Sequence, residues 1–132
     1  MHHILQPPGW APPIGYANGV AAESGRTIHV GGQIGWNAEQ QFESDDLVDQ
    51  VEHTLANVVA VLNEGGATAA HLVSLTWYLT DVDDYLANAK AVGRAYRETI
   101  GRHYPAMAVV GVTRLVERRA KVEIQAVAVV PD

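Results

Sequence analysis

The chain has 132 residues, with 9 lysines and arginines against 15 aspartates and glutamates, a formal net charge of −6 and no cysteine. This length predicts one domain, and a composition of 48% hydrophobic and 18% charged residues is typical of a globular fold. The lack of cysteine excludes disulfides, cysteine-ligated zinc and thiol nucleophiles, and the acidic balance argues against nucleic acid as a partner, since phosphate binding needs clustered lysine and arginine.

The N-terminal segment, residues 1–13, is rich in proline, which fixes φ and donates no backbone hydrogen bond. We therefore expect an irregular start to a single domain that spans residues 1–132. The segment lacks the apolar core of a signal peptide, and the apolar runs of the chain are too short to span a membrane. These features predict a cytoplasmic protein with no membrane partner.

Two short strands and a long helix are expected next. Residues 16–22 and 27–32 predict strands joined by a turn at 23–26, and the glycine-rich run 31–35 is expected to break the second strand. Residues 44–46 offer a capping side chain and carboxylates for a helix start, and Gly65 and Gly66 predict the helix end. The helix carries one apolar stripe, formed by Leu47, Val51, Leu55, Val58 and Leu62.

The second half of the chain predicts a strand, a helix and two further strands. Alternation over residues 72–79 places Val73, Leu75, Trp77 and Leu79 on one face of a strand. Residues 81–84 predict the start of a second helix, and Gly101 predicts its end; its buried stripe is formed by Tyr85, Ala89, Val92, Tyr96 and Ile100. Strands are expected over about 107–115 and 121–130. The order β-β-α-β-α-β-β predicts an α+β fold with two helices on one face of a mixed sheet.

Both faces of the expected last strand are largely apolar, because residues 122, 124, 126, 128 and 130 alternate with Glu123, Gln125, Val127 and Val129. The helices can cover only one of these faces. We therefore expect the other face to be covered by further copies of the chain.

The residues that could carry chemistry are few. The six histidines lack metal-ligand spacing, so no metal site is expected. The run 31–35 does not open a helix, which favours a sharp bend over a cofactor-binding loop. Trp10, Tyr16, Trp36 and Tyr104 lie in or beside loops, where aromatic side chains commonly line pockets or interfaces.

Glu123 is the most informative polar residue, since it lies within an otherwise apolar strand. One interpretation is a glutamate at the sheet rim that pairs with Lys121, two positions earlier on the same face. The other is a partly buried carboxylate that holds or deprotonates a water molecule.

Four motifs together resemble one family: IGYANG at 14–19, VGGQIGWN at 30–37, YPAM at 104–107 and KVEIQAVA at 121–128. They resemble the Rid family, also called YjgF-type or endoribonuclease L-PSP, and the resemblance covers nearly the whole chain. It implies a chorismate-mutase-like fold assembled as a homotrimer around a central barrel, with a ligand cleft at each subunit interface.

The resemblance also implies an activity: the hydrolysis of short-lived enamines and imines, such as 2-aminoacrylate, to keto acids and ammonia without a cofactor. Glu123 matches the family glutamate that positions the water. The cleft residues implied by the match are Tyr16, Gly31, Gly32, Gln33 and Tyr104. The family arginine that binds the substrate carboxylate is replaced by Met107, which offers no charge and no donor.

This replacement leads to two hypotheses. The first is an enzyme that hydrolyses an imine or enamine other than 2-aminoacrylate, with a polar tail other than a carboxylate, against an apolar wall formed by Met107 and Trp36. The second is a non-catalytic trimer that binds a small metabolite in the same cleft. Ribonuclease activity, suggested by the older family label, is disfavoured because the chain has no basic stripe.

Overall fold

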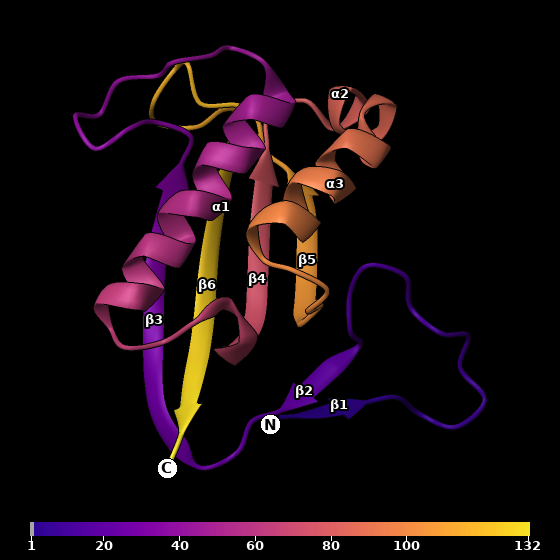
Figure 1. Ribbon diagram of the computed structural model, residues 1–132. Helices are drawn as coiled ribbons and strands as arrows, with labels where there is room; N and C mark the ends of the chain where they lie inside the picture. Colours follow the sequence, from indigo (N-terminus) through magenta and orange to yellow (C-terminus); the bar gives the residue numbers. More distant parts are fainter. Residues whose placement is uncertain (1) are drawn as a thin grey trace.

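The computed structural model describes residues 2–132, so Met1 lies outside the described residues. A four-stranded mixed sheet has the order β3-β6-β4-β5, and only the β4–β5 pair is parallel. Helices cover one face of this sheet (Figure 1), as the sequence predicts for an α+β fold. The strands of the sheet are β3 (Gly25–Ile34), β4 (Leu72–Leu79), β5 (Ala106–Gly111) and β6 (Val122–Pro131).

The first helix, α1 (Leu47–Glu64), begins and ends where the sequence predicts. The Asp46 carboxylate accepts a hydrogen bond of 3.1 Å from the Asp49 amide, and Gly65 ends the helix. All five residues of the predicted apolar stripe are buried. A short 3₁₀ helix, η1 (Ala69–His71), then leads into β4.

The predicted second helix is two helices, α2 (Val82–Ala87) and α3 (Ala89–Thr99). Asn88 separates them: its backbone leaves the helical region at φ −114°, and its side chain donates to the Asp84 carbonyl at 2.9 Å. An asparagine that bonds its own backbone in this way competes with helix continuation. Of the predicted buried stripe, Val92, Tyr96 and Ile100 are buried and Tyr85 is half-buried. Ala89 is exposed and lines a groove at the sheet edge, so the stripe is wrong at this position.

The N-terminal segment is less irregular than its prolines suggest. His3–Leu5 forms β1, which pairs with β2 (Gly19–Ala21) in a separate two-stranded sheet (Figure 1). Residues 3–5 precede the first proline and keep their backbone donors, which permits this pairing. The strand predicted over 16–22 is accordingly short and lies outside the main sheet, although the Ala17 amide donates to the Pro105 carbonyl at 3.0 Å.

Three predicted strand details are corrected by bulges and a loop. Gly31 and Gly32 do not end β3; they form a bulge, since the pairing with β6 shifts between Val30 and Gln33. A second shift near the start of β4 buries Leu72 where alternation predicts Val73. The strand predicted over 107–115 ends at residue 111, and residues 112–121 form a loop.

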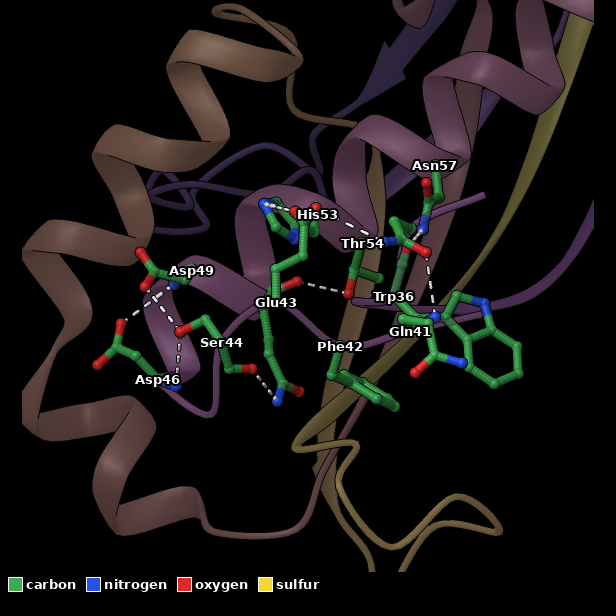
Figure 2. A network of polar contacts seen from close by, with 12 residues as sticks. Trp36, Gln41, Phe42, Glu43, Ser44, Asp46, Asp49, His53, Thr54 and Asn57 are labelled. Atoms are coloured by element: carbon green, nitrogen blue, oxygen red, sulfur yellow. Dashed lines mark hydrogen bonds and ion pairs between the residues drawn. The ribbon is translucent and has the colours of Figure 1, made fainter. Parts of the chain in front are cut away.

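The loop that follows β3 is tied to α1 by polar contacts (Figure 2). Asn57 donates to the carbonyls of Ile34 and Trp36 at 2.9 and 2.8 Å. Fully buried Gln50 donates to the carbonyls of Ser44 and Arg119 and accepts from the Lys121 amide, at distances of 2.8–3.0 Å. Gln50 therefore joins α1 to the loops on both sides of the sheet end.

The face of the sheet opposite the helices is more polar than the sequence predicts. The register places Glu123 opposite Tyr78 and Gln125 opposite Thr76, and the Tyr78 hydroxyl donates to Gln125 at 3.0 Å. Val127 and Val129 keep part of the face apolar. No helix within residues 2–132 is long and apolar enough to cross a membrane.

Candidate functional site

A groove of about 820 Å³ lies on the helix side of β4 and β5, at the free edge of the sheet. Its walls come from the loop 13–16, from α2 and α3, and from β5 with the residues before it (Figure 1). The lining residues are Pro13, Ile14, Gly15, Tyr16, Trp77, Tyr85, Ala89, Val92, Gly93, Tyr96, Arg97, Tyr104, Met107 and Val109. The groove is thus mainly apolar and aromatic, with a small number of polar groups, as is typical of small-molecule sites.

An aromatic wall runs along the groove. The rings of Tyr96 and Tyr104 stack with centroids 5.3 Å apart, and Trp77 also stacks against Tyr96 with centroids 6.4 Å apart. Tyr85 meets the Trp77 ring edge-on at 6.3 Å. These contacts fix the rings in place. Trp77 and Tyr96 are buried, so the half-buried Tyr85 and Tyr104 offer most of the aromatic surface to the groove.

The tyrosines of this wall stay neutral. Burial raises the pKa of Tyr85, and burial together with neighbouring Tyr104 raises the pKa of Tyr96 far above its usual value. The Tyr96 hydroxyl donates to the His103 carbonyl, which fixes its direction. Tyr85 and Tyr96 therefore carry no charge at neutral pH, and the Tyr96 hydroxyl, whose one hydrogen is already donated, can only accept from a ligand.

Three of the site residues predicted from the sequence meet in this groove. Tyr16, Tyr104 and Met107 all line it, although they come from a loop near the N-terminus, the residues before β5, and β5 itself. Tyr16 is exposed and Met107 is half-buried. Where the family motif has an arginine, the groove therefore has an apolar thioether.

The other predicted residues lie elsewhere. Glu123 is half-buried on β6, beside the bulge of β3 at Gly31 and Gly32; Gln33 follows the bulge and pairs with Ile124. A Cβ atom at Gly32 would collide with the Glu123 carboxylate, so the missing side chain gives the carboxylate its space. A Cβ atom at Gly31 would meet no atom within 4 Å. The side-chain amide of Gln33 donates to the Gly31 carbonyl at 3.2 Å.

Neither Lys121 nor Trp36 takes the place expected for it. Among residues 2–132 no ion pair joins Glu123 to Lys121, whose backbone amide instead donates to Gln50. Trp36 lies in the loop after β3, where its ring packs against Phe42 with centroids 5.9 Å apart (Figure 2). It is not part of the groove lining.

The sheet itself separates Glu123 from the groove. Trp77 and Met107, which line the groove, project from the helix side of β4 and β5. Glu123 is paired with Tyr78, the residue after Trp77, and side chains alternate between the two faces of a sheet. Glu123 therefore projects to the opposite face, and a site that uses both the groove and this carboxylate requires two chains.

Arg97 is a groove residue that the sequence analysis did not single out, and it is the one charged residue of the lining. It follows Gly93 and Ala89 at intervals of four on α3, so the three lie along one helix face. Two small residues followed by an arginine at this spacing are the signal that could have identified it. In the part of the chain that the structure describes, no group of three or more histidine, aspartate or glutamate side chains is placed to hold a metal ion.

Comparisons with known proteins point to one family. Residues 10–130 match the family described as Endoribonuclease L-PSP. A crystal structure of YyfB from Yersinia pestis, a Rid-family protein of unknown function, is 32% identical with a TM-score of 0.86, covering 98% of each chain.

Two further similar proteins carry names that bear on function. A 2-iminobutanoate/2-iminopropanoate deaminase from Dermatophagoides farinae is 27% identical over 129 residues, covering 96% of this chain and 95% of its own. The structure of TdcF from Escherichia coli with bound serine is 27% identical with a TM-score of 0.70, covering 93% of this chain and 92% of that one.

Proposed function

The chain belongs to the Endoribonuclease L-PSP family, which includes the Rid proteins, and on this premise we propose that it hydrolyses a small imine or enamine to a carbonyl compound and ammonia. The similar deaminase named above supports this reaction class. The replacement of the motif arginine by Met107 supports a substrate other than 2-aminoacrylate, because a small carboxylate beside Met107 would lose its bidentate partner.

The observation that carries the proposal is the environment of Glu123. Its carboxylate is half-buried, has no ion-pair partner within residues 2–132, and faces the space left by Gly32. A carboxylate in this position can accept a proton from a water molecule and hold that water in one direction. A glutamate at the sheet rim would stabilise the fold through an ion pair, and Glu123 makes no such pair with any residue that the structure describes.

We propose that each site forms between two subunits of a homotrimer. One subunit supplies the groove with Tyr16, Tyr104 and Met107. Its neighbour supplies Glu123 with the bulge at Gly31 and Gly32 and the Gln33 that follows it. The separation of these two sets by the sheet within one chain supports this arrangement. The uncovered face of the sheet, which carries Glu123, is the surface available for the contact.

The chemistry asked of such a site is modest. The carbon of a protonated imine is electrophilic, so the site must mainly hold it against one oriented water molecule. Glu123 accepts a proton as the water oxygen bonds to the imine carbon, which gives a carbinolamine. Glu123 then gives this proton to the amine nitrogen. As the C–N bond breaks and ammonia leaves, the hydroxyl group passes its proton back to Glu123 and the carbonyl forms; Glu123 then releases the proton to solvent.

A non-catalytic trimer that binds a small metabolite in the same groove is the alternative. The observation that favours it is Met107, since the family arginine that would orient a substrate carboxylate is absent from its motif position. This alternative predicts a ligand that raises thermal stability without turnover.

Ammonia release tests the proposal. Imines are generated in solution from a panel of amino acids and amines by an amino-acid or amine oxidase, and their hydrolysis is followed with wild type and Glu123→Gln. We expect accelerated hydrolysis of at least one imine and a loss of about a hundredfold in Glu123→Gln. Glu117→Gln, which removes a carboxylate from the exposed loop 112–121, is the matched control and retains the wild-type rate.

Equal rates for wild type and Glu123→Gln on every imine would contradict the mechanism. Stabilisation by a ligand with no hydrolysis of any imine would favour the binding protein.

A further inference from the structure

We propose that Arg97 binds the carboxylate of a ligand whose planar apolar body lies along the aromatic wall of Trp77, Tyr96 and Tyr104. The inference rests on the proposed function and deepens it, because it names the substrate class of the same groove. That class is the imine of an amino acid with an aromatic or other large apolar side chain.

The first argument is the position of the guanidinium. Arg97 lies one helical turn after Gly93, and a Cβ atom at Gly93 would stand only 3.3 Å from Arg97 Nη1. The guanidinium therefore folds back along α3 over the glycine, and the absence of a side chain there permits it. Ala89, one turn earlier still, keeps the same wall of the groove open.

The second argument is charge. Within residues 2–132 the observed ion pairs join His53 to Glu43 and Arg119 to Asp45, and no hydrogen bond from the Arg97 side chain is seen. Every other residue of the groove lining is apolar or a neutral tyrosine. Arg97 is exposed, and an arginine fork that is not engaged by residues 2–132, beside an apolar surface, is suited to a carboxylate attached to an apolar body.

The third argument is size. The groove of a single chain, before any neighbouring subunit narrows it, measures about 820 Å³, which is more than a three-carbon keto acid fills. The family motif has an arginine on the floor of the groove, at the position on β5 that Met107 occupies here. The cation of this groove is instead Arg97, on the wall formed by α3. A substrate that extends from Met107 on the floor to Arg97 on the wall must carry a larger side chain. The rings beside them supply its contact surface.

Binding of stable ligands tests the inference without relying on turnover. Phenylpyruvate, the keto acid that the imine of an aromatic amino acid would yield, is titrated by calorimetry beside phenylacetone, which carries a methyl group in place of the carboxylate. Pyruvate is the third probe, since it has the carboxylate and lacks the aromatic body.

The variants are Arg97→Gln and, as the matched control, Arg94→Gln, which removes an arginine from the same helix at a position outside the groove lining. We expect wild type to bind phenylpyruvate at least about tenfold more tightly than either phenylacetone or pyruvate. Arg97→Gln should remove the preference for phenylpyruvate over phenylacetone, Arg97→Lys should restore part of it, and Arg94→Gln should keep it whole.

Equal affinity for phenylpyruvate and phenylacetone, no effect of Arg97→Gln, or no binding of either compound would overturn the inference. Equal affinity for pyruvate and phenylpyruvate would overturn the aromatic part of it. If the binding pattern is found and Glu123→Gln hydrolyses imines as fast as wild type, the proposed function fails while this inference stands.

Discussion

The substitution Gly32→Ala tests whether the space beside Glu123 matters for catalysis. The added Cβ would lie 2.8 Å from the carboxylate carbon of Glu123 and 3.1 Å from its Cγ, and still closer to one carboxylate oxygen. To reach ordinary van der Waals contact the carboxylate must retreat by about 0.6 Å or more. Because Gly32 does not have a positive φ, the backbone itself accepts alanine without strain.

The expected cost falls on the rate and not on stability. A shift of about 1 Å in a catalytic group can reduce the rate about a hundredfold, so we expect kcat/KM for imine hydrolysis to fall by about ten- to a hundredfold. Glutamate is flexible at its far end, so the free energy of unfolding should change by less than about 1 kcal/mol. Ammonia release and thermal unfolding measure the two quantities separately.

The neighbouring glycine supplies a matched control. A Cβ at Gly31 meets no atom within 4 Å, so Gly31→Ala leaves the Glu123 carboxylate in place and should reduce the rate far less than Gly32→Ala does. The reasoning is refuted if Gly32→Ala and Gly31→Ala are equally active, because the displaced carboxylate would then have no part in the reaction.

Three further predictions concern the groove and the fold. Met107→Arg restores the arginine of the family motif on the groove side of β5, and we expect it to raise the hydrolysis of 2-iminopropanoate about tenfold or more over wild type; no gain would show that other differences exclude this substrate. Gln50→Met leaves two carbonyls and one amide without partners. Thermal unfolding should therefore show a loss of about 3 kcal/mol in the free energy of unfolding, or about 10 °C in Tm. The control Gln41→Met, on the exposed loop, should change Tm by no more than about 2 °C. The pKa of Tyr96 is raised in the folded state, so the stability that its neutral form contributes is complete below its ordinary pKa of about 10 and is lost as the pH rises above it. Near-ultraviolet absorbance titration should show Tyr96 ionising only as the protein unfolds, and Tyr96→Phe should remove that late step. Ionisation of Tyr96 near the ordinary tyrosine pKa of about 10 in the folded protein would contradict the assignment.

Local sequence signals predict most of the fold. The cap at Asp46, the end at Gly65 and the stripe from Leu47 to Leu62 are all confirmed in α1, since capping and period are decided within a few residues. The family resemblance and the α+β arrangement are likewise confirmed by the comparisons.

The errors arise where a distant partner decides the local structure. Gly31 and Gly32 look like the end of a strand, but pairing with β6 continues beyond them and turns them into a bulge. His3–Leu5 has no strong strand pattern and forms β1 only because β2 returns beside it. Asn88 divides the second helix through its own hydrogen bonds to the backbone and side chain of Asp84, which apolar periodicity does not detect.

The sequence motifs predict the residues of the candidate site, but they do not predict which of these residues lie together in space. Tyr16, Tyr104 and Met107 meet in one groove, but the register that places Glu123 on the other face of the sheet is fixed by pairing with β4. The sequence does not single out Arg97 among the seven arginines of the chain, because its place in the groove depends on the small residues that precede it on α3 and on the aromatic wall opposite.

Subunit complementation tests most directly whether the site is shared between chains. Glu123→Gln removes the carboxylate, and Ala89→Trp fills the groove from an exposed position of α3, so each variant alone should be inactive. When the two are unfolded together and refolded at equal amounts, random assembly of trimers should give about one quarter of the wild-type rate, because one site in four then combines an intact groove with an intact Glu123. A mixture no more active than the separate variants would contradict a site formed between two subunits.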